Sequence, residues 1–456
     1  NVTAHDADIA NARPHPGVAP SGHHEPRAGR THWSQLALVS AAEFVVWTGF
    51  GAIMPYLPIF LQEEAHSSLF LIGVIAAAFY LGTLAFSSPL GWLSDLVGRK
   101  PVIVAGTFLY ALAMFLFTRT AEPWWFVLFR LLEGVGTAAV APAATALVAD
   151  ISRPGDRSKA YGVLTSAQFG GLIVGPALAP PLYHLAGGGR AGFYAIFYFG
   201  AALTAATAVA VAAVLREPSA TAQRRAQREG RAAAAAAGAA APGQAAAGRE
   251  AAADTARPTP RGAWREVLTP PIVAFLVVAF TSHFAMGGFE VIWSIWLKHL
   301  GASMTYISLT WIVFSVPMLL SFAGGILADR YSRFTLMFTG YTVSALAWIV
   351  YGTTRDLGLF LAVNAVEGLA VAFSYPPKQA FLVQVSPPQW LGTVTGLEAT
   401  AMQLAGMLGT FATPVLYERM SGYVLALGGV VNLVGLAVAA PVLYRAWRRV
   451  APPRAG

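Results

Sequence analysis

The sequence predicts an all-α integral membrane protein with twelve transmembrane helices in two bundles of six. First, 56% of the residues are hydrophobic and only 11% are charged, whereas soluble domains carry about 25% charged residues. Second, the chain contains many continuous apolar runs, and roughly 20 helical residues cross the hydrocarbon core of a bilayer. Third, the second half repeats the first at a constant spacing of 234 residues, which predicts two halves of the same fold.

Apolar runs place six helices in the first half of the chain. Short segments that contain charged, glycine or proline residues separate these runs. The runs are continuously apolar, so they lack the alternating pattern over about ten residues that a membrane β-barrel strand requires. The predicted helices are 35–61, 69–90, 101–118, 123–149, 160–184 and 192–215.

Six further apolar runs follow in the second half. They have similar lengths and the same kind of interruptions, and each is long enough to span a bilayer as a helix. The predicted helices are 270–297, 304–328, 334–353, 357–383, 392–416 and 422–446.

Composition divides the rest of the chain. Residues 1–33 are rich in His, Pro, Gly and Arg and predict a disordered cytoplasmic tail, and no cleavable signal peptide is expected because the first apolar stretch exceeds signal length. Residues 217–265 contain Ala, Arg, Gly and Pro but no Leu, Ile, Val or Phe, which predicts a cytoplasmic linker. The two bundles are then 34–216 and 266–447, followed by a cytoplasmic tail at 448–456.

The distribution of basic residues predicts the orientation. With both termini cytoplasmic, 23 of the 30 Lys and Arg residues lie on the inside and five on the outside, as the positive-inside rule requires. The protein is therefore expected to be a multi-pass protein of the plasma (bacterial inner) membrane. The net charge of +8 then reflects topology and contact with anionic lipids, and nucleic-acid binding is not expected.

The chain has no cysteine, which excludes disulfides, thiolate metal sites and thiol catalysis. It also lacks a recognisable nucleotide-binding loop or cluster of metal ligands. We therefore expect no metal, no cofactor and no enzymatic activity.

The internal repeat is carried by glycines, prolines and acids in one register. A chance match of common glycines is the alternative, but prolines and an intramembrane glutamate share the same spacing. The pairs are Gly91 with Gly325, Asp95 with Asp329, Arg99 with Arg333, Glu133 with Glu367, Gly134 with Gly368, Pro142 with Pro376, Gly162 with Gly396, Gly175 with Gly409, and Pro180 with Pro414. Because 234 residues contain an even number of spans, the halves have the same orientation, as in transporters built from parallel repeats.

Three motifs resemble those of the major facilitator superfamily. The stretch "GWLSDLVGRK" is similar to its signature loop between helices 2 and 3, "RLLEGVGTA" to a helix-4 motif of its proton-driven members, and "GGLIVGPALAP" to a helix-5 motif of its antiporters. The helix-5 motif departs from the family pattern at Ala179 and Pro180, where two glycines are usual. The resemblance covers residues 35–446 and implies a secondary transporter that works by alternating access.

The resemblance also implies a conformational latch, in which an acid and a base of the signature loop hold the halves together on the cytoplasmic side in the outward-open state. A role limited to setting topology is the alternative for the basic residues. In the loop itself, Asp95 is expected to cap or face a helix amino terminus. The latch residues are Gly91, Asp95, Gly98, Arg99 and Lys100, with Asp329 and Arg333 in the second copy.

In the helix-5 motif, Gly171 and Gly175 lie on one helix face, so a neighbouring helix can approach closely. Pro176 then interrupts the backbone hydrogen bonds. Plain packing and a role in blocking leak are both compatible with this pattern.

Ionisable residues within the spans are the candidates for proton coupling, because charges at bilayer depth are costly and usually face a cavity or a partner. Seven of them lie on helices 1, 4, 7 and 10, and these helices line the central cavity in the superfamily. The proton-coupling candidates are Glu43, Arg130, Glu133, His283, Glu290 and Glu367; Lys378 is predicted either in the cavity or at the cytoplasmic edge, and Glu398 near that edge.

Arg130 and Glu133 are three positions apart, so the two side chains share a helix face and can pair. A conformational change that alters their contact would load or release a proton; a static pair that holds helix 4 in place is the alternative. Glu43 and Glu290 have no obvious partner three or four residues away, which favours a proton carrier or a counter-charge for a cation. His283 is either titratable or a hydrogen-bonded packing residue.

Aromatic residues accompany these acids, and an acid among aromatics suits an amphipathic or cationic organic compound. The predicted function is therefore proton-coupled export of such compounds by a multidrug-type antiporter, acting as a monomer with protons and membrane lipids as its other partners. A lipid or glycolipid flippase on the same fold is the alternative, and a sugar or metabolite transporter is less favoured because few amides lie in the spans. The substrate-cavity candidates are Phe44, Trp47, Phe50, Phe289, Trp293 and Asn364.

Overall fold

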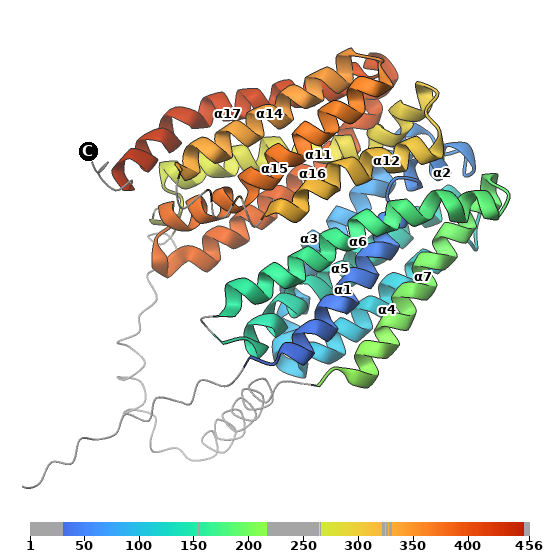
Figure 1. Ribbon diagram of the computed structural model, residues 1–456, viewed down its shortest axis with the longest axis horizontal. Helices are drawn as coiled ribbons and strands as arrows, with labels where there is room; N and C mark the ends of the chain where they lie inside the picture. The colour runs from blue at the N-terminus through green and yellow to red at the C-terminus, as the bar shows by residue number, and fades with distance from the viewer. Residues whose placement is uncertain are drawn as a thin grey trace, which may run out of the picture.

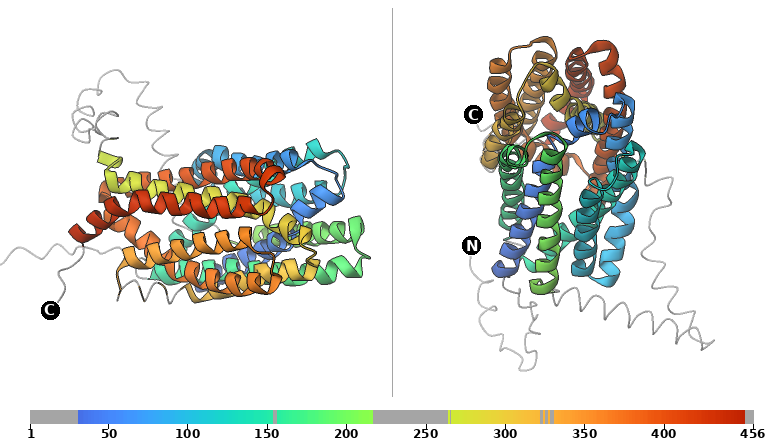
Figure 2. Two further views of the ribbon diagram at one scale, coloured as in Figure 1. Left: turned by 90° about the horizontal axis from the view of Figure 1, so that it is seen from above. Right: turned by 90° about the vertical axis from the view of Figure 1, so that its right-hand side faces the viewer.

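The computed structural model describes residues 31–153, 156–216, 264, 266–321, 324, 327 and 331–450 of the chain. The predicted amino-terminal tail and linker lie almost entirely outside these residues, as do most of the carboxyl-terminal tail and Asp329 of the second charged motif. The described chain forms two helical bundles, one from each half of the sequence, whose helices run along a common direction (Figures 1 and 2).

The described residues of the first half form seven helices, and α1 and α2 together make the first passage. Hydrophobic residues on these helices, including Phe60, Phe117 and Phe126, pack into the core of the bundle. The helices are α1 (Trp33–Ile53), α2 (Leu57–Glu63), α3 (Leu69–Val97), α4 (Arg99–Leu116), α5 (Pro123–Ile151), α6 (Arg157–Leu185) and α7 (Gly189–Val214).

The second half repeats this arrangement. Its elements are α11 (Pro270–His299), α12 (Met304–Ser315), η2 (Val316–Leu320), α14 (Arg333–Thr353), α15 (Leu357–Val385), η3 (Pro388–Trp390), α16 (Leu391–Met420) and α17 (Tyr423–Val450). Among the described residues, ten passages are long and apolar enough to cross a membrane by themselves; α12 with η2 is shorter, and the 30-residue α16 is less apolar. With these two, each half has six passages, and the predicted twelve-helix fold is confirmed.

Two predicted helices are broken, and each break contains a proline, which lacks the N–H that a helix interior requires. Pro55 lies between α1 and α2, where a continuous helix over 35–61 was expected. Pro317 lies in the 3₁₀ segment η2, where α12 ends at Ser315 instead of continuing. The prediction of one uninterrupted helix was wrong in both places. Pro142 lies within the continuous α5, so proline alone does not locate a break.

The charged motif is almost entirely helical, so the predicted loop at 91–100 was wrong. Helix α3 continues through Val97 and α4 begins at Arg99, which leaves Gly98 alone between them. Gly98 has a φ of 108°, a left-handed conformation that favours glycine. The residue before α4 is Gly98, which has no side chain to cap the helix, and Asp95 forms an ion pair of 2.6 Å with Arg99, the first residue of α4.

Helix contacts confirm the internal repeat. A Cβ atom added to Gly134 of α5 would lie 2.2 Å from the carbonyl oxygen of Phe79 in α3. One added to Gly368 of α15 would lie 2.4 Å from the carbonyl oxygen of Phe314 in α12. Each glycine therefore lets helix 4 of its half touch the backbone of helix 2, and any larger residue would force these helices apart.

The helix-5 motif brings α6 against α1. A Cβ atom at Gly171 would lie 2.5 Å from the carbonyl oxygen of Phe44, and one at Gly175 would lie 2.4 Å from that of Thr48. The ring of Pro176 packs against Gly51 on the same side. The motif thus has the close packing that its spacing predicts, and a role in blocking leak stays a prediction.

The halves meet at one end of the molecule. We call the end where α7 ends and α11 begins the linker end, and the opposite end the far end (Figure 1). At the far end, the Tyr56 hydroxyl donates to the carbonyl oxygen of Met304 at 3.1 Å and lies 2.8 Å from the Ser308 hydroxyl. Glu63 of α2 and Lys298 of α11 form an ion pair at 3.5 Å. These contacts close the far end.

Toward the linker end the two bundles diverge (Figure 1). Among the described residues, no atom from outside the local helix lies within 4 Å of a Cβ built on Gly162 of α6 or on Gly392 and Gly396 of α16. By contrast, a Cβ built on Gly73, near the far end of α3, would lie 3.0 Å from the carbonyl oxygen of Thr410 in α16. The conformation is therefore closed at the far end and open at the linker end.

Candidate functional site

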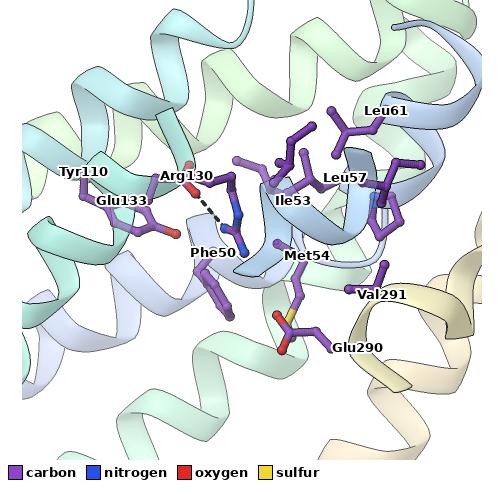
Figure 3. A pocket seen from close by; sticks show the side chains of 14 residues that line it. Phe50, Ile53, Met54, Leu57, Leu61, Tyr110, Arg130, Glu133, Glu290 and Val291 are labelled. Atoms are coloured by element: carbon purple, nitrogen blue, oxygen red, sulfur yellow. Dashed lines mark hydrogen bonds and ion pairs between the residues drawn. The ribbon is translucent and has the colours of Figure 1, made fainter. Parts of the chain in front are cut away.

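A small cavity between the halves brings together the charged residues of helices 4 and 7. Residues from α1, α2, α3, α4, α5 and α11 line it, and Figure 3 shows their side chains converging on one space. About 30 Å³ is open to the centres of water molecules, which is room for roughly two waters. Its lining includes Phe50, Met54, Tyr110, Arg130, Glu133 and Glu290.

Arg130 and Glu133 form the pair that their spacing predicts. The guanidinium and carboxylate of these two α5 residues are 2.7 Å apart, and both side chains are buried. The guanidinium also lies over the ring of Phe79, 4.6 Å from its centre, where a cation–π contact adds to the ion pair. Among the described residues its buried Nε atom has no hydrogen-bond partner, so at least this donor is available to a further ligand.

Glu290 links the second half to the first. It belongs to α11, and its carboxylate accepts a hydrogen bond of 2.7 Å from the hydroxyl of Tyr80 in α3. In Figure 3 the carboxylate of Glu290 lies beside Met54 and faces the same space as Arg130. The acid is therefore held at a contact between the two bundles.

Glu43 lies apart from this cavity, within the first half. Its carboxylate accepts hydrogen bonds of 3.0 Å from the indole of Trp47 and 3.0 Å from the amide of Gln168. The sequence interpretation that Glu43 has no partner three or four residues away was therefore wrong, because Trp47 lies four residues on and donates to it. The side chain is 7% exposed and its partners are neutral.

A second cavity lies inside the second half, among aromatic rings. About 20 Å³ of it is open to the centres of water molecules, and Phe289, Trp293, Trp348, Asn364 and Glu367 are among the residues that line it. Phe289 stacks on Trp293 with ring centres 4.7 Å apart. An acid enclosed by aromatic rings is suited to a compact organic cation.

The second cavity holds its acid differently from the first. Glu367 accepts a hydrogen bond of 2.9 Å from the hydroxyl of Tyr351. Its position in the repeat corresponds to Glu133, and Asn364 corresponds to Arg130. The Asn364 amide donates to the carbonyl oxygen of Phe360 at 3.2 Å. The guanidinium of the first half is thus replaced by neutral groups in the second.

The other predicted cavity residues are distributed unevenly. Phe50 lines the cavity between the halves, but neither Phe44 nor Trp47 lines either of the two cavities. Phe44 packs instead against α6, where its ring lies near Gly170. His283 has its Nδ1 atom 3.0 Å from the carbonyl oxygen of Ala279 in its own helix, which is the geometry of a hydrogen-bonded packing residue.

Lys378 and Glu398 form a second buried ion pair. Their charged atoms are 2.7 Å apart, and the side chains are 2% and 5% exposed. The pair joins α15 to α16 near the linker end, since each residue lies seven positions from that end of its helix. The sequence left Lys378 undecided between the cavity and the cytoplasmic edge, and the structure places it in the interior with Glu398.

The predicted latch residues contact each other within the first half. Arg99 forms ion pairs with Asp95 at 2.6 Å and with Asp150 of α5 at 3.5 Å, and it donates to the hydroxyl of Ser94 at 2.8 Å. In the second copy of the motif, Arg333 is the first residue of α14. The latch between the halves stays a prediction, because the conformation in which it would form has the linker end closed.

Sequence reasoning missed the tyrosines that complete both sites. These are Tyr80, Tyr110 and Tyr351, which lie within apolar runs, where a buried hydroxyl needs a hydrogen-bond partner. That need was a usable signal, but the identity of each partner depends on the packing of distant helices. Among the described residues, no three His, Asp or Glu side chains come together as metal ligands.

The chain matches one protein family over most of its length. The family is described as Major Facilitator Superfamily, and the match covers residues 39–314 and 275–456.

Curated relatives and solved structures share this similarity. Multidrug resistance protein 2 of Bacillus subtilis (strain 168) is 25% identical over 405 residues, which cover 87% of this chain and 92% of the relative. Quinolone resistance protein NorA of Staphylococcus aureus is 30% identical over 135 residues, which cover 30% of this chain and 34% of the relative. A bacterial homologue of the human lysosomal transporter Spinster, solved in an inward-facing and occupied conformation, superposes with a TM-score of 0.67 at 16% identity, covering 92% of this chain and 97% of that one. At that identity the structural likeness shows the fold alone.

Proposed function

Because the chain belongs to the major facilitator superfamily, and is therefore a multi-pass membrane transporter and not an enzyme, we propose that it exports amphipathic or cationic organic compounds in exchange for protons. The proposed orientation places the linker end and both termini in the cytoplasm, in the plasma membrane, and the transporter works as a monomer. The described conformation is then inward-open.

One observation carries the proposal. Glu290 of the second half accepts a hydrogen bond from Tyr80 of the first half, beside the buried pair of Arg130 and Glu133. Because the two partners belong to different bundles, their bond breaks when the far end opens. Glu290 then meets outside water and binds a proton, which becomes its carboxylic hydrogen. The proton is released to the inside when the far end closes again, so the state of the acid follows the state of the transporter.

The surroundings of the acids support the substrate class. Glu367 lies among stacked aromatic rings, and Glu290 lies among Phe50, Met54 and other apolar side chains. A cation with apolar parts gains both charge pairing and aromatic contact in such places. It competes with the proton for the same carboxylates, which is the exchange that an antiporter needs. The name of Multidrug resistance protein 2, similar over 87% of this chain, favours the same class.

Transport by the purified chain in proteoliposomes tests the proposal. We expect an imposed pH gradient, acidic on the side that faces the far end, to drive a fluorescent organic cation toward that side. A sugar and a fluorescent phospholipid in matched vesicles serve as the other substrates. Movement of the lipid without movement of the cation would contradict the proposal in favour of a flippase, and cation movement that ignores the pH gradient would contradict proton coupling.

Two substitutions are expected to move the conformational equilibrium in opposite directions. Tyr56→Phe removes the hydroxyl that bonds Met304 and Ser308 across the far end, so the outward-open fraction should rise by about fivefold for a bond of roughly 1 kcal/mol. Asp95→Asn weakens the proposed latch, so the inward-open fraction should rise. Paired distance probes on the far ends of α3 and α16 measure both fractions. Shifts in the same direction, or no shift in either variant, would contradict the view that Tyr56 holds the far end closed and Asp95 holds the linker end closed.

A further inference from the structure

A groove at the linker end of the second half is separate from both cavities of the candidate site. It lies where α11 begins and where α15 and α17 end, and about 390 Å³ of it is open to the centres of water-sized molecules. That volume falls in the range of about 300–1,000 Å³ typical of small-molecule sites. The residues that line it are Pro270, Pro271, Gln384, Val385, Val442, Arg445, Ala446 and Arg449.

The groove carries positive charge and no acid. Arg445 and Arg449 lie four residues apart on α17, so both guanidinium groups follow one helix face. Both are exposed, and among the residues that the structure describes neither has an ion-pair or hydrogen-bond partner. Glu266, the acid that precedes α11, accepts a hydrogen bond of 3.0 Å from Trp390 and does not line the groove.

The backbone adds to this charge. Pro270 and Pro271 are the first residues of α11, the preceding Thr269 provides no side-chain cap, and the first turn contains no acid. The positive end of the helix dipole therefore faces the groove without compensation. Gln384, at the end of α15, offers an amide that can donate a hydrogen bond. The groove is built for an anion.

The rest of the lining is apolar, which a soluble anion does not require. Val385, Val442 and Ala446 form the wall next to the arginines. Trp390 and Trp447 lie at the same end of the bundle, and tryptophans gather at the boundary between the hydrocarbon core and water. An occupant with a phosphate next to an apolar chain fits both parts, and basic pockets between helices on the cytoplasmic side are where anionic lipids bind.

We propose that this groove binds the phosphate of an anionic phospholipid from the cytoplasmic leaflet, with Arg445 and Arg449 as its ligands and the apolar wall against the first part of an acyl chain. The assignment of the leaflet rests on the orientation proposed above. The lipid would join the ends of three helices of the second half and so favour its movement as one body.

Native mass spectrometry of the purified full chain, titrated with phosphatidylglycerol or phosphatidylcholine, tests the proposal. We expect phosphatidylglycerol to bind preferentially. The double variant Arg445→Gln/Arg449→Gln should weaken that binding about 25-fold, since each arginine near the membrane surface contributes about fivefold. Arg448→Gln is the matched control, because Arg448 lies over the ring of Tyr444 at 5.7 Å and does not line the groove. Equal binding by the double variant and the wild type would overturn the site.

Two further experiments distinguish lipid binding in the groove from general attraction between charges and from binding of a soluble anion. Val442→Trp fills the apolar wall but keeps both arginines, so it should also weaken phosphatidylglycerol binding at least tenfold; an unchanged affinity would overturn the groove. Inorganic phosphate at millimolar concentration should not displace the lipid, and displacement would reassign the site to soluble phosphate. None of these readouts depends on transport, so they fail or succeed independently of the antiport proposal.

Discussion

Glu290→Gln is expected to abolish accumulation driven by a pH gradient while leaving the protein folded. Glutamine has nearly the same shape and its carbonyl oxygen can still accept the hydrogen bond from Tyr80, but it binds no proton in the physiological range. For exchange of one proton for one substrate molecule, a pH difference of one unit sustains about a tenfold substrate gradient. The variant should lose that gradient and keep only equilibration. Fluorescent-cation transport in proteoliposomes with and without the pH difference measures this directly.

Two companion variants distinguish proton binding by Glu290 from its hydrogen bond with Tyr80. Tyr80→Phe removes the donor and keeps the acid, so accumulation should persist with an altered rate. Glu133→Gln removes the acid that pairs with Arg130 at 2.7 Å, and it identifies whether that pair also carries the proton. Gradient-driven accumulation by Glu290→Gln at the wild-type level would show that Glu290 is not essential, and loss in Glu133→Gln alone would transfer the role to the helix-4 pair.

The helical framework follows from the sequence because its signals are local. Continuous apolar runs predict the membrane passages. The constant spacing between Gly134 and Gly368 and between Gly175 and Gly409 predicts the two repeated halves. Each of these glycines touches the backbone of a neighbouring helix, where a side chain does not fit. The pair of Arg130 and Glu133 is local for the same reason. The contact of Trp47 with Glu43, four residues apart, was equally readable and was missed.

The other contacts within the candidate site and the breaks in the helices depend on how distant helices pack, and the sequence did not predict them. Tyr80 and Glu290 are 210 residues apart, and no spacing rule in the sequence predicts a hydrogen bond between residues so far apart. The proline breaks depend on context too, since Pro55 lies between two helices and Pro142 lies inside one. Lys378 looks the same in sequence whether it faces water or a buried acid.

The buried pair of Lys378 and Glu398 provides the second large effect. Lys378→Met leaves the Glu398 carboxylate, which is 5% exposed, without its cation. Breaking one partner of a buried pair typically costs about 3–5 kcal/mol, so we expect the melting temperature of the purified protein to fall by about 5–10 °C. Lys298→Met is the control, because the pair of Lys298 with Glu63 is more than a third exposed on each side and should matter by at most about 1 kcal/mol. Equal melting temperatures for Lys378→Met and the wild type would contradict a stabilising role of the buried Lys378–Glu398 ion pair.

The first half indicates what happens when both charges are removed. The residues that correspond to Lys378 and Glu398 in the repeat are Ala144 and Leu164, and both are buried and apolar. The same place in the fold is therefore stable without an ion pair, since apolar packing carries no desolvation penalty. We expect the double variant Lys378→Met/Glu398→Leu to recover most of the stability that Lys378→Met loses. If its transport rate nevertheless falls, the pair is retained in the second half for a step of the transport cycle and not for folding.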